Sequence, residues 1–141
     1  ESGKIQYERT ECDIIQLCRQ VITTINAKED SKVSVILQAE VESLQVQTDK
    51  QWFESLLTSL LTPVENDEEH YQPIVCVNYD HVKSTLCFDV LNAPLAKARF
   101  ENKTSLIRHE INAHFVHSSG GIYKVQAEAK EGPTISFTIP L

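Results

Sequence analysis

The stretch VQTDKQWFESLLTSLL, residues 46–61, decides the fold, because it joins a strand end to a helix with a broad apolar face. Its apolar side chains recur at positions i, i+1, i+4, i+5, i+8 and i+9, which predicts a helix packed on a core: Trp52, Phe53, Leu56, Leu57, Leu60 and Leu61. Thr48 with Gln51 forms a capping-box pattern, and Asp49 is an alternative N-cap. Pro63 removes a backbone donor, so we expect the helix to stop or bend there.

Upstream of this stretch, the sequence predicts a short strand at 4–9 and a helix at 13–26. Thr10 and Asp13 are both suitable helix caps. The apolar residues of this helix recur on one face: Ile14, Leu17, Cys18, Val21 and Ile25.

Six further segments have strand patterns: 33–40, 43–49, 73–80, 84–91, 122–129 and 134–141. The first two are close enough in sequence to pair as a hairpin. The last two are expected to pair through the turn at Glu131-Gly132-Pro133.

A third helix is expected from Thr104 to His117, with Ile107, Ile111 and Phe115 in register on its inward face and Gly120-Gly121 closing it. The complete order is then β α β β α β β α β β. This order predicts an α/β (α+β) two-layer sandwich, with one mixed β-sheet and three helices on one of its faces.

Composition limits the possible functions. The 141 residues fit one domain, and the net charge of −7 argues against nucleic acid or an anionic membrane as partner, because phosphate binding needs clustered Lys and Arg. No run approaches the ~18–20 apolar residues that span a bilayer. The four cysteines lack CxxC spacing, which favours a reducing cytoplasm. The sequence has no methionine, and we expect it to be a domain excised from a longer protein.

Four motifs occur in a characteristic order: YERTECDIIQLCRQVI (7–22), VQTDKQWFESLLTSLL (46–61), INAHFVHSSGGIYKV (111–125) and GPTISFTIPL (132–141). Together they resemble the ATP-binding catalytic domain of sensor histidine kinases, within the Bergerat-fold ATPases. The resemblance covers essentially the whole chain. It implies that residues 1–141 form one histidine kinase-like ATPase domain of a two-component sensor protein, with a Bergerat-type sandwich.

The asparagine box of this family departs from its pattern here. The resemblance implies that Ser59 and Pro63 stand where the family presents two asparagines to magnesium and phosphate. A serine hydroxyl still reaches a metal-bound water, but a proline side chain offers neither donor nor acceptor. The sequence then turns acidic, at Glu65, Asp67, Glu68 and Glu69.

Both glycine boxes depart as well. In the first, Asp-x-Gly-x-Gly, the matching residues are Leu91, Ala93 and Leu95, and leucine cannot accept the adenine amino hydrogen bond that the family's aspartate accepts. Asp89 lies on the same strand face as Leu91, about 7 Å away along the strand, as a possible substitute. The glycine positions of the second box fall on Leu106 and Arg108. With four glycines in the whole chain, a phosphate-cradling backbone loop is not available.

Other site chemistry is weakly indicated. His109, His114 and His117 lie on the expected third helix, and His114 and His117 are three apart, which is acceptable metal-ligand spacing, but no cysteine or acid stands at a matching interval. We therefore expect no metal site.

Two functions remain open. The first is a degenerate catalytic-type domain that does not bind ATP in the usual way, needs no cofactor and acts through protein contacts. The partners implied by the family are a dimerisation domain of the same polypeptide, a response regulator or another kinase. The second is an active ATP-dependent histidine kinase or ATPase with a rewired site, using ATP and magnesium through Ser59, Asp89 and the basic residues from Lys97 to Arg108. Either way the expected location is cytoplasmic, in a parent protein whose membrane anchoring the family makes plausible.

Overall fold

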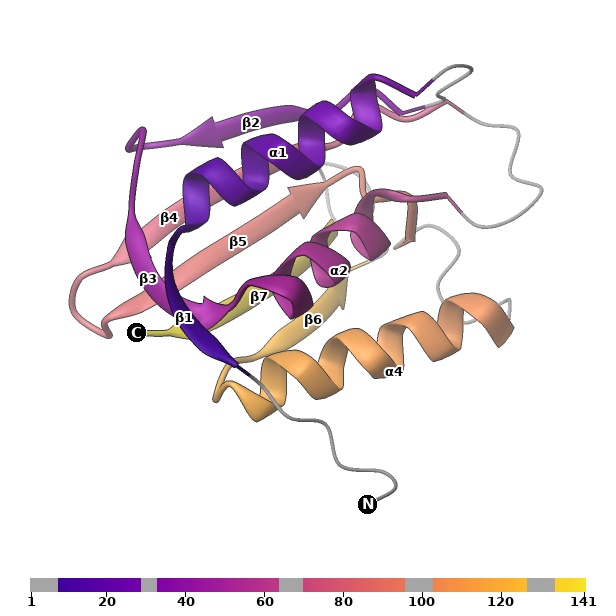
Figure 1. Cartoon of the computed structure of the whole chain (residues 1–141). Coiled ribbons are helices and arrows are strands. Elements are labelled where there is room, and N and C mark those ends of the chain that lie inside the picture. The colour runs from indigo at the N-terminus through magenta and orange to yellow at the C-terminus, as the bar shows by residue number, and fades with distance from the viewer. Residues whose placement is uncertain (1–7, 29–32, 64–69, 96–102, 127–133) are drawn as a thin grey trace.

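The computed structural model describes residues 8–28, 33–63, 70–95, 103–126 and 134–141. Its elements follow the predicted order: β1 (Arg9–Asp13), α1 (Ile14–Asn26), β2 (Ile36–Ala39), β3 (Gln45–Asp49), α2 (Lys50–Leu61), β4 (Ile74–Asp80), β5 (Thr85–Leu91), α4 (Lys103–Ser118), β6 (Tyr123–Gln126) and β7 (Thr134–Pro140). The three helices lie side by side on one face of a sheet (Figure 1), which confirms the two-layer sandwich.

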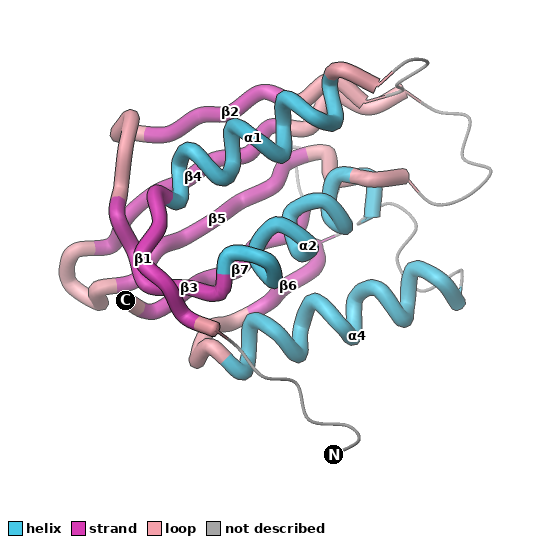
Figure 2. Tube along the Cα trace, viewed as in Figure 1, coloured by secondary structure: helices cyan, strands magenta, loops and turns pink. Residues whose placement is uncertain are grey.

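The large sheet has five strands in the order β2-β4-β5-β7-β6. The β2–β4 pair is parallel and the other three pairs are antiparallel, so the sheet is mixed, as predicted. The prediction of a single sheet was wrong, because β1 and β3 form a separate two-stranded antiparallel sheet at one end of the helix layer (Figure 2).

The predicted hairpin of residues 33–40 and 43–49 was also wrong. β3 pairs with β1, and β2 runs parallel to β4. The carboxylate of Asp13 explains the route of the chain, because it accepts hydrogen bonds from the Leu44 amide at 3.1 Å and the Ser43 hydroxyl at 2.7 Å. These bonds hold the chain before β3 at the start of α1, beside β1.

The helix boundaries follow the capping residues that the sequence offers. Asp13 caps α1 and Asp49 caps α2, each accepting from a backbone amide of the first turn. α2 ends at Leu61, two residues before Pro63, as predicted. The first described strand is Arg9–Asp13 rather than 4–9, and residues 4–7 lie outside the described part of the chain.

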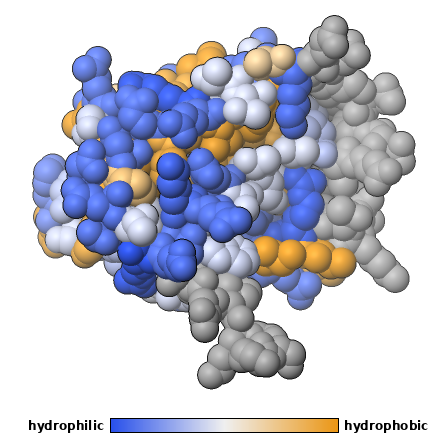
Figure 3. Space-filling view, viewed as in Figure 1, coloured by the Kyte–Doolittle hydropathy of each residue, from blue (hydrophilic) through white to orange (hydrophobic). Residues whose placement is uncertain are grey.

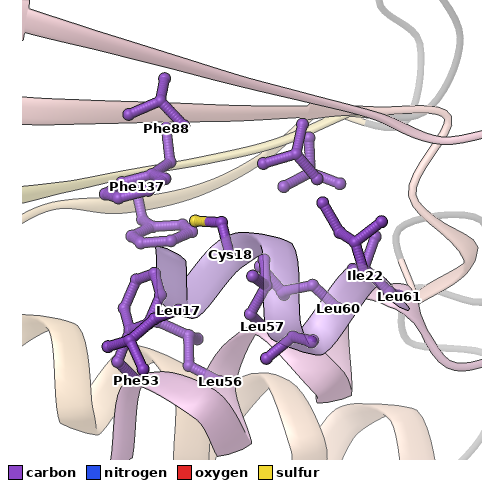
Figure 4. Packing of buried hydrophobic residues seen from close by; sticks show 14 of the residues in the cluster. Leu17, Cys18, Ile22, Phe53, Leu56, Leu57, Leu60, Leu61, Phe88 and Phe137 are labelled. Atoms are coloured by element: carbon purple, nitrogen blue, oxygen red, sulfur yellow. The ribbon is translucent and has the colours of Figure 1, made fainter. Parts of the chain in front are cut away.

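The core lies between the helices and the large sheet (Figure 4). Phe53 of α2 contacts Phe88 of β5 and Phe137 of β7, with ring centroids 5.4 Å and 6.5 Å apart. Phe88 and Phe137 stack at 4.6 Å. The even-numbered residues of β5 therefore point toward the helices, and the odd-numbered ones lie on the opposite face of the sheet.

The predicted orientation of the last helix was wrong in part. Phe115 is buried, but Ile107 and Ile111 are 54% and 50% exposed. The buried positions of α4 include two polar residues, His109 and Asn112, because both hydrogen-bond to other elements. Polar partners rather than apolar side chains therefore set the rotation of this helix.

Candidate functional site

The polar contacts of the helix layer concentrate where the end of α2 faces α4. The Arg108 side chain of α4 donates from Nε to Ser59 Oγ at 3.3 Å. Its Nη2 donates to the backbone carbonyls of Ser59 and, at 2.7 Å, Thr62. We call these three contacts the Arg108 clamp. The clamp joins α4 to carbonyls at the C-terminal end of α2, where the helix dipole favours a cation.

A network of neutral polar groups continues from the clamp. Asn112 donates from Nδ2 to Ser59 Oγ at 3.1 Å. The Tyr123 hydroxyl and His109 Nδ1 share a hydrogen bond of 2.8 Å, and the backbone of Leu95 hydrogen-bonds His109. The network thus links α2, α4, β6 and the turn after β5.

Burial sets the charge state of this network. It lowers the pKa of His109, opposed by the hydrogen bond that the imidazole donates to the Leu95 backbone carbonyl and assisted by the charge of Arg108. Burial also raises the pKa of Tyr123, against the effects of Asn112 and Arg108. Imidazole and phenol are therefore neutral at pH 7, and the guanidinium carries the charge of the cluster. Burial lowers the pKa of Arg108 too, although arginine stays protonated at neutral pH.

Two of the sequence-predicted site residues meet here. Ser59 and Arg108, 49 residues apart, are in direct contact. Pro63 is half-buried just beyond Thr62, and Leu106 is exposed one turn before the inward part of α4. Because Leu106 and Arg108 both lie within α4, the positions matched to the second glycine box are helical rather than part of a loop.

Asp89 and Leu91 are not part of this contact. Phe88 and Val90 are fully buried toward the helices, so Asp89 and Leu91 lie on the other face of the sheet. Asp89 accepts a 2.6 Å hydrogen bond from Ser136 on the neighbouring strand β7. Asp89 and Leu91 therefore share a face, as strand alternation predicts, but that face is opposite the helix layer.

Ala93 and Leu95 point into the core and have no exposed surface. Asn92, between Leu91 and Ala93, keeps a left-handed backbone with φ of 57°. The turn after β5 thus retains one backbone conformation that glycine favours, while two side chains fill the space around it.

A groove of about 190 Å³, the α2–α4 groove, runs between α2 and α4 beside this network. Its lining is Trp52, Ser55, Leu56, Ser59, Arg108, Ile111, Asn112 and Phe115. Trp52 and Phe115 stack with centroids 5.9 Å apart, closing the floor at one end. A more open hollow of about 530 Å³ adjoins the other side of Arg108, and Glu54 supplies its one carboxylate wall.

Sequence reasoning missed Asn112 and Tyr123 and treated His109 only as one of several helix histidines. The available signal was the spacing of His109, Asn112 and Phe115 at intervals of three, a half-polar stripe competing with the apolar one. Within the described residues, no group of three or more His, Cys, Asp or Glu side chains is placed to hold a metal ion. No helix in that part of the chain is long and apolar enough to cross a membrane.

Comparison with known proteins gives matches among solved structures alone. No family model matches the sequence, and no curated protein does. The catalytic domain of the histidine kinase ThkA matches with a TM-score of 0.74 and 18% identity, over 94% of this chain and 97% of its own. Full-length ShkA, solved with AMPPNP, matches with a TM-score of 0.76 and 18% identity over 98% of this chain, which spans 32% of the ShkA chain.

A histidine kinase from Burkholderia phymatum matches with a TM-score of 0.72 and 15% identity, over 94% of this chain and 70% of its own. Each of these three likenesses covers at least 94% of this chain. The chain has the fold of histidine kinase catalytic domains.

Proposed function

We propose that this domain is the catalytic-type part of a histidine kinase-like signalling protein, that it does not bind ATP in the manner of the family, and that it acts through protein contacts. The Arg108 clamp carries this proposal. A protein side chain and two helix carbonyls make the contacts at the position that the resemblance assigns to magnesium and phosphate.

The magnesium side of the site supports the proposal. Ser59 Oγ accepts from both Arg108 and Asn112, which uses the lone pairs with which it would bind a metal-bound water. A guanidinium beside it opposes a divalent cation at the same position. Pro63, at the second asparagine position, has no side chain that could replace Ser59.

The side of the site that the resemblance assigns to adenine supports the proposal as well. Ala93 and Leu95 are fully buried where the family has glycines, so their side chains belong to the core rather than to a ligand cradle. Asp89 lies on the face of the sheet opposite Ser59 and is hydrogen-bonded to Ser136. An active site with rewired chemistry would need Ser59 and Asp89 to contact the same nucleotide. Their positions on opposite faces of the sheet disfavour that alternative.

Thermal unfolding with nucleotide tests the proposal. The domain is heated with ATP, ADP or AMPPNP at millimolar concentration, with and without magnesium, beside full-length ShkA as a control for the assay. A ligand present at one hundred times its Kd stabilises by ~2.7 kcal/mol, which raises the melting temperature by several degrees. We expect a shift for ShkA and none for this domain. A saturable, magnesium-dependent shift of this domain would overturn the proposal and restore the active alternative.

The partners that fit this role are those of a two-component protein. They are a dimerisation domain of the same polypeptide, a response regulator or another kinase. The fold likeness to ThkA and ShkA supports this class of partner. Pull-down of a co-expressed dimerisation domain, compared with the same experiment on Ile107→Ser at an exposed position of α4, measures whether the helix layer takes part.

A further inference from the structure

The face of the large sheet that points away from the helices, here called the open face, carries few charges. Hydrophilic residues cover most of the helix side of the molecule (Figure 3). On the open face, the charged side chains of the five strands are those of Asp80, Asp89 and Lys124, and the others are neutral. The Asp80 carboxylate accepts from two amides of the turn after β4. Depletion of charge distinguishes the centre of a protein interface from the rest of a surface, so the open face has the composition of an interface.

The other two charges, those of Asp89 and Lys124, lie in one row across the open face. Asp89 of β5 pairs with Ser136 of β7, and Ser136 pairs with Lys124 of β6. Two strand spacings separate the backbones of Asp89 and Lys124, which is about 10 Å. The Ser136 hydroxyl between them donates to Asp89 Oδ1 at 2.6 Å. An acid and a base therefore lie on opposite sides of β7, at the same height along the strand.

The neighbouring row has the same arrangement with apolar groups. Thr138 of β7 pairs with Cys87 of β5 on one side, and on the other side its amide donates to the Ile122 carbonyl at 3.0 Å. Tyr123 points toward the helix layer, where its hydroxyl hydrogen-bonds His109. Strand alternation therefore places Ile122 on the open face, and its side chain is 59% exposed. An exposed isoleucine and a half-buried thiol thus flank β7, as the two charges do.

One two-fold axis, parallel to β7 and midway between two open faces, matches both rows at once. Such an axis lays β5 of one copy over β6 of the other and keeps every residue in its own row. Lys124 of each copy then faces Asp89 of the other, and Ile122 faces Cys87. Sheets packed face to face lie about 10 Å apart, a distance that facing side chains fill. The open face is therefore complementary to itself, both in charge and in hydrophobicity.

We propose that the open face binds a second copy of this domain in a two-fold dimer, with Lys124 paired to Asp89 and Ile122 packed on Cys87 across the interface. The inference goes beyond the proposed function and does not depend on it, because the open face lies opposite the helix layer that contains the Arg108 clamp. Three overlapping strands, the longest of seven residues, cover about 340 Å² of sheet per copy. Standard interfaces bury about 800 Å² per partner, so the dimer should be weak and form toward millimolar concentration.

Sedimentation equilibrium of the domain, from micromolar to millimolar concentration, gives the Kd of the dimer. Alkylation by N-ethylmaleimide, mapped by mass spectrometry, identifies the face, because Cys87 should react more slowly as the dimer forms. Cys12, in the separate two-stranded sheet, is the internal control, and its rate should not change with concentration. We expect a monomer–dimer equilibrium that protects Cys87 and gives no larger species, since a two-fold interface closes on itself.

Two charge reversals test the pairing of residues. In Lys124→Glu two carboxylates face each other across the interface, and in Asp89→Lys two ammonium groups do. Each variant alone should therefore dimerise at least about tenfold more weakly than the native domain. In an equimolar mixture, a heterodimer of the two variants pairs opposite charges at both contacts, so dimerisation should return. A heterodimer no tighter than the two variant homodimers would overturn the proposal.

Ile122→Ser and Ile107→Ser form a matched pair, with side chains 59% and 54% exposed on the open face and on α4. Ile122→Ser should weaken the dimer about tenfold and Ile107→Ser should leave it unchanged. Circular dichroism verifies folding, and this pair carries the test if Asp89→Lys, which loses the hydrogen bond from Ser136, does not fold. A domain that stays monomeric at millimolar concentration, or equal effects of the two serine variants, would also overturn the dimer. A nucleotide-induced thermal shift overturns the proposed function instead and leaves the dimer as it is.

Discussion

Replacing Arg108 with alanine removes the Arg108 clamp and should destabilise the domain measurably. The variant loses one hydrogen bond to Ser59 Oγ and two to the backbone carbonyls of Ser59 and Thr62. It also loses a cation at the C-terminal end of α2. Asn112 remains as a donor to Ser59 Oγ, so that hydroxyl keeps one partner.

The magnitude follows from these contacts. Hydrogen bonds to charged groups contribute about 1.5–3 kcal/mol each when well buried. Arg108 is half-buried, and water replaces it at the two carbonyls, so about 1 kcal/mol per bond is the appropriate value. The expected loss is then about 2–3 kcal/mol, or roughly 5–10 °C in melting temperature for a domain of this size.

Urea unfolding at pH 7 measures this loss, with Arg19→Ala as the matched control. Arg19 is an exposed arginine of α1 with one long bond, 3.4 Å from Nη1 to the Glu42 carbonyl. Its removal should change the free energy of unfolding by less than about 0.5 kcal/mol. Arg108→Lys should fall between the two, because lysine keeps the charge but not the three-point geometry. Equal stabilities of the two alanine variants would refute the importance of the clamp.

Three further predictions concern other parts of the fold. Gly121→Ala should cost more than about 3 kcal/mol in equilibrium unfolding, because its Cβ would overlap the backbone carbonyl of Thr138. Gly120→Ala, with φ of 86° and an ordinary contact between its Cβ and Pro140, should cost about 1 kcal/mol. Asp49→Ala should cost about 1–2 kcal/mol in the same assay, since the carboxylate accepts from the Trp52 and Glu8 amides. Burial lowers the folded-state pKa of His109, so the unfolded state binds more protons as the pH drops below about 6.5. The free energy of unfolding should therefore decrease, by up to ~1.4 kcal/mol for each pH unit of acidification. Urea titrations between pH 5 and 7.5 should show this slope in the native chain and a smaller one in His109→Gln.

Local signals predicted the elements well and their long-range pairing poorly. The apolar spacing of α2 and the caps Asp13 and Asp49 are properties of neighbouring residues, so the sequence contains them directly. The parallel pairing of β2 with β4 joins strands separated by β3 and α2, and no local pattern encodes it. Proximity in sequence instead favoured a hairpin with β3.

The sequence predicted several residues of the candidate site, but it did not predict the contacts between them. Ser59 and Arg108 came from separate motifs, and the hydrogen bonds between them depend on how two helices pack. Strand alternation placed Asp89 and Leu91 on one face, but it does not say which face meets the helices. His109 and Asn112 were missed because apolar periodicity was assumed to set the rotation of α4, and here buried polar pairs set it.

Under the proposed function, the departures from the family pattern reinforce one another and single reversions do not restore a nucleotide site. The Oδ1 of an asparagine at position 59 would accept from the two donors, Arg108 and Asn112, that Ser59 Oγ now serves, and so would not be available to a metal ion. Glycine in place of the fully buried Leu95 would leave a cavity, and leucine truncations in cores cost about 2–5 kcal/mol. Each change needs its neighbour to change first, because the groups that would contact a ligand now contact each other. A domain in this condition keeps its stability by keeping its site closed.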